Sequence, residues 1–231
     1  MGDTMPCVEA MVPAPDGEIW AEDTGSGTEV VLIHGDWTDS RPTQPFSRLG
    51  DLRAVLDHFA IQNAVAVGHS GGGGTALGLA IHSPGRTRAV TLIAPGIHDY
   101  PWPDKDAYLQ ESVPLIAAAD HDGLVSLGLR TWAPAGADPA TAAMMRGAVS
   151  SWFQIGDLET QDPPGFGLLG TVRTPAVMLL GDQEYPMVTD VSRAIAARLS
   201  GTETIFVPRA DHLLPLREPE IVMNAIAKVA G

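Results

Sequence analysis

Hydrophobic residues in this chain fall into two recurring patterns. Short, continuous apolar runs, typical of strands buried on both faces of a sheet, occupy residues 29–34, 64–68, 89–94, 175–181 and 204–207. Segments in which apolar residues recur every three or four positions, typical of amphipathic helices, occupy residues 51–59, 72–82, 188–199 and 219–229. Because strands and helices alternate, the pattern predicts an α/β protein with a mostly parallel sheet flanked by helices.

Two further regions depart from this alternation. Residues 8–12 and 18–22 have the composition of short strands and flank a turn signal, Pro15-Asp16-Gly17, so we expect the sheet to contain about seven strands. Residues 98–170 instead combine prolines, tryptophans and alanine-rich helical segments. We therefore expect a core formed by residues 1–97 and 171–231, with residues 98–170 inserted as a helical cap over one end of the sheet.

The composition and charge of the chain exclude several classes of protein and partner. With 231 residues, 45% of them hydrophobic, the chain is long enough to bury a substantial core. Its net charge of −14 repels phosphate backbones, so we expect no nucleic-acid partner. No apolar run approaches the roughly 20 residues of a membrane helix, and the first residues do not have the pattern of a secretory signal. The sequence also has a single cysteine, Cys7, so we expect a cytoplasmic protein without membrane association.

The most specific motif is Gly68-His69-Ser70-Gly71-Gly72, which fits G-x-S-x-G and lies between a predicted strand and a predicted helix. A sharp strand-to-helix turn strains the serine backbone, so the positions two residues away must be small. The turn would lift the Ser70 hydroxyl above the sheet, at the positive end of the following helix. The motif therefore predicts a catalytic serine, the alternative being a glycine-rich turn that happens to contain one.

A serine hydroxyl is a weak nucleophile and needs a base. His212 follows the last predicted strand, at the same end of the sheet as Ser70, and is the candidate base; the alternative is a surface histidine. We expect His69 and His34 to have structural roles. A carboxylate that orients His212 should follow the strand at 175–181, where Glu184 and Asp182 are both candidates, and Asp99 is a more distant third.

Acyl chemistry also requires donors for the oxyanion. One should be the backbone amide of Gly71, directly after the serine. The other should come from the loop after His34-Gly35, from the amide of Asp36 or of Trp37. An acidic side chain at Asp36 would weaken this site unless it turns toward solvent. The sequence has no dinucleotide-binding fingerprint and no cluster of metal-ligating residues, so we expect no cofactor and no metal.

Together these segments resemble the α/β-hydrolase superfamily, specifically its bacterial esterase, lactonase and carbon–carbon hydrolase branch. The matching segments are V-V-L-I-H-G at 30–35, D-L-R-A-V-L-D at 51–57, A-V-A-V-G-H-S-G-G-G at 64–73, A-V-M-L-L-G-D-Q-E-Y-P at 176–186 and A-D-H-L-L-P-L-R-E-P-E at 210–220. In the G-x-x-D pattern of that family the acid falls on Glu184, where aspartate is usual. Residues 98–168 match the position of the variable cap.

One departure from the family is large. Only 34 residues separate Gly35 from Ser70, and the D-x-R-G-x-G turn usual in this connection is missing, as if one helix–strand unit had been deleted. The leading hairpin must then pair directly with the strand at 29–34, or that strand is left as an exposed edge. A homodimer could cover such an edge. We expect no strand within residues 36–50 and a site that is more open on that side.

The resemblance implies a serine hydrolase acting on a small ester, lactone or related acyl compound. Four aromatic residues of the cap region are candidates for binding the substrate, although they could equally be cap core: Trp102, Trp132, Trp152 and Phe153. A second hypothesis keeps the fold but assigns a biosynthetic reaction, as a cyclase, lyase or thioesterase. A third is a non-catalytic ligand-binding protein that retains the motif.

Overall fold

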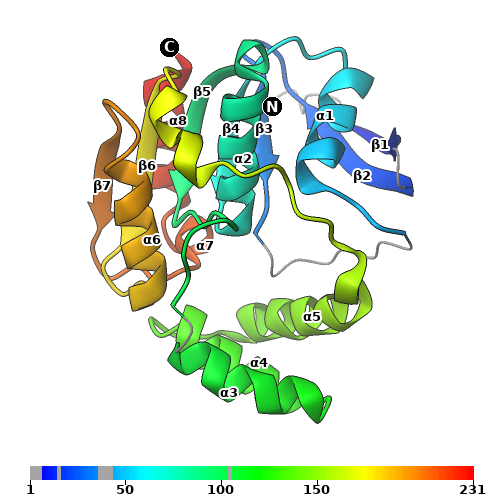
Figure 1. Ribbon diagram of the computed structural model, residues 1–231, viewed down its shortest axis with the longest axis vertical. Coiled ribbons are helices and arrows are strands. Elements are labelled where there is room, and N and C mark those ends of the chain that lie inside the picture. Colours follow the sequence, from blue (N-terminus) through cyan, green and yellow to red (C-terminus); the bar gives the residue numbers. More distant parts are fainter. Residues whose placement is uncertain (1–6, 15–16, 36–43, 104–105) are drawn as a thin grey trace, which may run out of the picture.

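A parallel sheet of five strands forms the centre of the protein (Figure 1). The computed structural model describes residues 7–14, 17–35, 44–103 and 106–231. The sheet order is β3-β4-β5-β6-β7, and each strand coincides with one of the predicted apolar runs. The interior strands β4, β5 and β6 consist almost entirely of buried residues, as expected for strands covered on both faces. The strands are β3 (Val30–Ile33), β4 (Ala64–His69), β5 (Thr87–Ile93), β6 (Ala176–Gly181) and β7 (Glu203–Val207).

Helices cover the two faces of this sheet unequally. On one face, side chains of α1, α2 and α6 pack with alternate strand residues such as Ala66 and Leu92. On the other face, α8 and the short α7 pack with the intervening residues such as Val65 and Val67. The predicted α/β class is therefore confirmed. The helices are α1 (Arg48–His58), α2 (Gly71–His82), α6 (Pro186–Ala196), α7 (Leu214–Arg217) and α8 (Pro219–Ala230).

The leading hairpin does not join the sheet. Strands β1 (Cys7–Ala14) and β2 (Gly17–Thr24) form a separate antiparallel pair that lies beside α1 (Figure 1). The described residues contain seven strands, but the prediction that about seven strands share one sheet is wrong: the central sheet has five, because β1 and β2 pair only with each other. Gly25 and Gly27, both with positive φ, redirect the chain between β2 and β3. As a result, β3 is an edge strand, the second of the two arrangements that the sequence allowed.

The connection from β3 to β4 is short. Its described part contains α1 and no strand, and Phe46 forms only an isolated bridge with Glu159. The expectation that no strand lies within 36–50 is therefore met over 44–50, while residues 36–43 lie outside the described part. Among the described strands, β3 pairs only with β4, from Val30 opposite Val65 to Ile33 opposite Gly68.

Three helices fill the region where the sequence predicted a cap. They lie beyond the carboxyl ends of the strands, at the bottom of Figure 1, and share a cluster of buried side chains with Ala94, Leu180 and Val188 of the core. No helix in the described ranges is long and apolar enough to span a membrane. The helices are α3 (Ala107–Ala117), α4 (His121–Trp132) and α5 (Pro139–Ile155), and 3₁₀ turns occur at Pro84–Arg86, Gly156–Leu158 and Phe166–Thr171.

Candidate active site

Ser70 occupies a strained turn between β4 and α2. Its backbone has φ 53° and ψ −123°, a conformation that residues with a side chain rarely adopt. A Cβ atom on Gly68 would lie 2.2 Å from the carbonyl oxygen of Gly72, and one on Gly72 would lie 2.3 Å from that of His34. The small residues that the motif requires are therefore dictated by backbone approach. Ser70 caps α2 without a side-chain capping bond, which leaves its hydroxyl available.

His212 and Glu184 form a buried pair. The Nδ1 atom of His212 lies 3.0 Å from both carboxylate oxygens of Glu184. The Tyr185 amide donates a further hydrogen bond to Glu184 Oε1, 2.9 Å away, and so helps to fix the carboxylate. A proton on Nδ1 shared with Glu184 leaves Nε2 of His212 free to act as a base.

The other two acids contact different groups. Asp182 Oδ1 accepts a hydrogen bond from the backbone N–H of Arg209 at 2.6 Å. Asp99 accepts from the amides of Gly165 and Phe166, at the start of a 3₁₀ turn. Asp182 directly follows β6 and binds the chain as it leaves β7, whereas Glu184 lies two residues farther on and reaches His212. Of the three candidates, the structure brings only Glu184 to the histidine.

Ser70 and His212 line the same cavity. In the described part of the chain no hydrogen bond joins the Ser70 hydroxyl to His212. Such bonds are often long in unliganded sites and shorten when substrate binds. The arrangement therefore gathers a serine, a histidine and a carboxylate, groups that can act as nucleophile, base and orienting acid, although the serine and the histidine are not hydrogen-bonded to each other.

His69, next to the serine, contacts the backbone of the candidate base. Its Nε2 donates to the carbonyl oxygen of His212 at 2.7 Å, and the two rings lie 4.9 Å apart. Burial, reinforced by the neighbouring His212, lowers the pKa of His69 to about 3, so the imidazole is neutral. His69 thus has the kind of structural role that we expected: its hydrogen bond to the His212 carbonyl fixes the position of the loop that carries His212.

Asp211 is a residue that the sequence reasoning missed. Its fully buried carboxylate pairs with Arg217 at 3.0 Å and accepts hydrogen bonds from the amides of Leu213 and Ala135, each at 3.1 Å. The Arg217 guanidinium also donates to the Gly136 carbonyl. These contacts tie the His212 loop to the segment after α4. The sequence did contain a signal for this pair: an acid stands directly before His212, and an arginine follows that acid by six residues.

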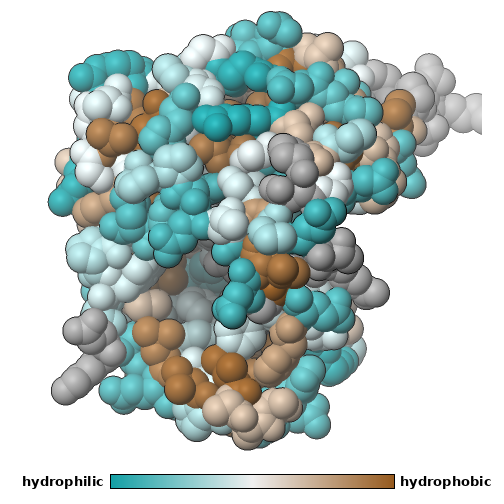
Figure 2. All heavy atoms as spheres, turned by 45° about the vertical axis from the view of Figure 1, so that its right-hand side comes forward, coloured by the Kyte–Doolittle hydropathy of each residue, from teal (hydrophilic) through white to brown (hydrophobic). Residues whose placement is uncertain are grey.

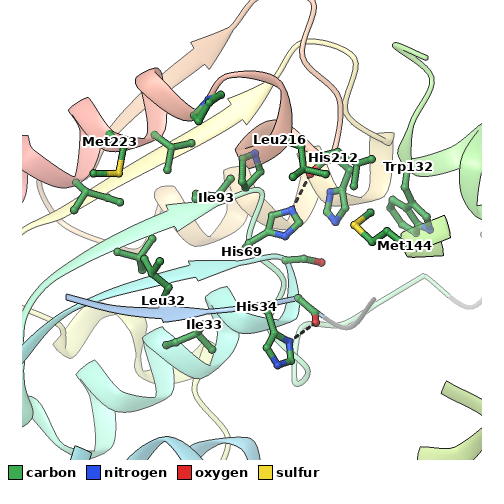
Figure 3. A pocket seen from close by; sticks show the side chains of 18 of the residues that line it. Leu32, Ile33, His34, His69, Ile93, Trp132, Met144, His212, Leu216 and Met223 are labelled. Carbon is green, nitrogen blue, oxygen red and sulfur yellow. Dashed lines mark hydrogen bonds between the residues drawn. The ribbon is translucent and has the colours of Figure 1, made fainter. Parts of the chain in front are cut away.

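Ser70, His69 and His212 line a cavity of about 430 Å³, a volume within the range of small-molecule sites (Figure 3). None of its described lining residues is Asp, Glu, Lys or Arg, so the cavity suits an uncharged, apolar ligand. Figure 2 shows that the surface is hollowed between the cap helices, at the bottom, and the core above them. Besides Ser70 and His212, the wall is formed by Leu32, Ile33, His34, Gly35, Val67, His69, Ile93, Trp132, Met144, Met145, Leu213, Pro215, Leu216, Pro219, Val222, Met223 and Ile226.

Only one of the four aromatic residues proposed from the sequence lies on this wall. Trp132, at the end of α4, packs against His212 with ring centroids 4.9 Å apart. Trp102 contacts Tyr100 in the core, Phe153 stacks on His121, and Trp152 is partly exposed on α5. Their sequence positions did not reveal which side of each cap segment faces the cavity.

Of the expected oxyanion donors, only Gly71 lies within the described residues. Gly71 directly follows Ser70 as the first residue of α2, where the helix dipole favours negative charge. Asp36 and Trp37 lie outside the described residues. Gly35, just before them, passes close to the serine, since a Cβ atom on Gly35 would lie 2.9 Å from Ser70 Cβ. Within the described ranges, no three His, Cys, Asp or Glu side chains are grouped so that they could hold a metal ion.

Comparisons with known proteins show what the chain as a whole is similar to. None of the curated proteins compared with the chain matches it. Among solved structures, naproxen esterase (carboxylesterase NP) from Bacillus subtilis is 16% identical with a TM-score of 0.73, over 97% of this chain and 91% of that one. The 2-hydroxy-6-oxo-6-phenylhexa-2,4-dienoate hydrolase from Rhodococcus sp. strain RHA1 is 17% identical with a TM-score of 0.72, over 97% and 99%. An enol-lactonase from Burkholderia xenovorans LB400 is 18% identical with a TM-score of 0.65, over 89% and 92%.

These structural likenesses show a shared fold. The family model described as "Alpha/beta hydrolase family" matches residues 17–225, nearly the whole chain. This match agrees with the resemblance seen in the sequence motifs. On this ground, the chain belongs to the alpha/beta hydrolase family.

Proposed function

We propose that the protein is a serine hydrolase that cleaves a small, uncharged ester, lactone or related acyl compound through an acyl-enzyme intermediate. The observation that carries this proposal is the presence, around one apolar cavity, of the strained Ser70 and of His212 paired with Glu184. The names of structurally similar proteins, which include an esterase and a lactonase, support an acyl substrate.

In the first half of the reaction, Ser70 Oγ bonds to the substrate carbonyl carbon while its proton moves to His212 Nε2. The carbonyl π electrons move onto oxygen, and the Gly71 amide at the start of α2 stabilises the resulting charge, with a second donor from the loop that contains Asp36 and Trp37. When the carbonyl re-forms, the bond to the leaving alkoxide breaks and the alkoxide takes the proton from His212.

In the second half, water replaces the alcohol. It gives a proton to His212 Nε2 as its oxygen bonds to the acyl carbon, and collapse of the second tetrahedral intermediate breaks the bond to Ser70. Ser70 recovers its proton from His212, and the acid product leaves. Throughout, the Glu184 carboxylate holds the Nδ1 proton and stabilises the charged imidazolium.

The test is hydrolysis of p-nitrophenyl butyrate by the wild type and by the variants Ser70→Ala and His212→Ala. Each substitution is expected to lower kcat by a factor of about 10³ or more, because Ser70→Ala removes the nucleophile and His212→Ala removes the base that activates it. Ser126→Ala and His58→Ala, on the surface of α4 and at the end of α1, serve as matched controls.

Labelling with a fluorophosphonate separates the remaining hypotheses. Labelling of Ser70 without turnover of any simple ester would favour a dedicated biosynthetic reaction on the same serine. A folded wild type that neither labels nor turns over esters would contradict the proposed chemistry and favour a ligand-binding protein.

A further inference from the structure

The three most exposed large hydrophobic side chains of the described residues lie around one cavity. Leu32, Met223 and Leu216 have exposed fractions of 72%, 62% and 60%, and all three line the cavity that contains Ser70. Single exposed apolar residues are common on proteins, but a contiguous apolar surface marks a site of binding.

This surface follows from the shortened connection between β3 and β4. Because β3 is an edge strand, Leu32 projects from the sheet on the side that α8 covers only in part. Buried residues of the same face, Val67 and Ile93 from the sheet and Val222 and Ile226 from α8, continue the apolar wall. We term this surface the β3–α8 groove; it consists of Leu32, Val67, Ile93, Leu216, Val222, Met223 and Ile226.

The groove and the cap helices line opposite ends of the cavity. Figure 3 shows Leu32 and Met223 on one side of His69, and Trp132 and Met144 on the other side, beyond His212. In the proposed reaction, His212 must protonate the leaving group, which therefore lies next to His212 and the Trp132 ring packed against it. The acyl portion then extends away from Trp132, into the groove.

We propose that the β3–α8 groove binds the straight aliphatic acyl chain of the substrate, which makes medium-chain acyl esters the preferred substrates; this inference rests on the proposed serine hydrolase function. The groove has no charged described residue, so it offers contacts to methylene groups and none to a charged or highly polar acyl group. Full burial of one methylene is worth about a fourfold gain in binding.

The experiment compares kcat/KM for p-nitrophenyl octanoate with that for p-nitrophenyl butyrate. In the wild type we expect the ratio of octanoate to butyrate to be at least about 10, since the added methylenes lie in a partly open groove. Met223→Gln and Leu32→Gln are each expected to lower this ratio at least about threefold, and the double variant about tenfold.

Two matched controls carry the same substitutions on exposed side chains outside the groove. Met11 on β1 and Leu168 in a 3₁₀ turn have exposed fractions of 53% and 43%. Met11→Gln and Leu168→Gln should leave both rates and their ratio unchanged. A fall in the ratio that is confined to the groove variants supports the proposal.

Three other outcomes would overturn it. If Met144→Gln lowers the ratio and the groove variants do not, the acyl chain of the substrate lies under the cap helices instead of in the groove. If sedimentation shows a dimer that Met223→Gln dissociates, with the ratio unaffected, a second copy of the protein covers the groove. A wild type that prefers butyrate to octanoate would also contradict the proposal.

Failure of the hydrolase proposal is distinguishable from failure of this inference. If the wild type turns over no ester, calorimetry with the Ser70→Ala protein compares binding of methyl octanoate and methyl butyrate. Tighter binding of methyl octanoate that is lost in the additional Met223→Gln variant would support the groove without the hydrolysis. Equal binding of the two esters would overturn the groove as well.

Discussion

One face of the central sheet is covered by α1, α2 and α6, whereas the other is covered by α8 and the short α7. The first face is held by interdigitated apolar side chains, with Leu56, Leu77 and Leu79 fully buried. Around the second face lie the buried polar contacts of the site, including those of Asp211 and His69. Both faces have fully buried apolar side chains, so the second face differs from the first in its exposed rim at Leu32 and Met223 and in the directional contacts that hold the His212 loop beside it.

The largest effect expected from breaking those directional contacts is catalytic. Glu184→Gln removes the charge that stabilises the His212 imidazolium and can favour the wrong tautomer, so kcat for ester hydrolysis should fall about 10³- to 10⁴-fold. Asp182→Asn, two residues away, is the matched control and should change kcat only a few-fold, because Asp182 binds the Arg209 amide instead. Equal losses in the two variants would contradict the assignment of Glu184.

The next effect concerns the ion pair behind His212. Asp211→Ala leaves the Arg217 guanidinium and two backbone amides without their carboxylate, and we expect the free energy of unfolding in urea to fall by about 3–5 kcal/mol. Asp190→Ala, on the surface side of α6, provides a control. A loss of under about 1 kcal/mol would show that this contact does not stabilise the open face.

The densely packed face offers the corresponding hydrophobic test. Leu77→Ala, in α2, leaves a cavity among α1, α2 and the sheet, and should lower the free energy of unfolding by about 2–5 kcal/mol. Met223→Ala, on the exposed rim of the other face, should change it by at most about 0.5 kcal/mol. Similar losses at the two positions would remove the distinction between the faces.

The smallest effect at neutral pH is expected at His69, because His69→Gln keeps a donor for the His212 carbonyl. In acid, the free energy of unfolding of the wild type should diverge from that of the His69→Gln variant. The pKa of His69 is lowered from 6.5 to about 3 by burial, so its contribution to stability is present above pH 6.5 and is lost as the pH falls toward 3. Urea denaturation at a series of pH values should therefore show a weaker loss of stability in the variant between pH 6.5 and 3. Parallel curves would show that His69 does not contribute.

Some features of the site could be predicted because they depend on neighbours in the chain. Gly68 and Gly72 are required by the backbone of the turn itself, and Ser70 has the strained conformation that the motif indicated. The apolar runs became the five strands of the sheet, since a strand buried on both faces must be apolar throughout. Glu184 was one of three candidate acids, and the geometry distinguishes it from Asp182 and Asp99.

Other features depend on contacts between distant segments. Whether the hairpin would pair with β3 could not be predicted, because either arrangement satisfies the same strand pattern. The faces of Trp102, Trp152 and Phe153 were equally undetermined, since hydrophobic residues of a cap can pack inward or line a cavity. The Asp211–Arg217 pair likewise required the fold of the loop around them.

By itself, the sequence determined the α/β pattern, the strained turn at Ser70 and the short connection of 34 residues between Gly35 and Ser70, because each depends on neighbouring residues or on a count along the chain. The tertiary structure decided the rest. It left β3 as the edge of the sheet, brought Glu184 to His212, and gathered Leu32, Leu216 and Met223 around one cavity. The physical reason is that pairing and packing depend on distances between segments far apart in the chain, which no local pattern of residues specifies.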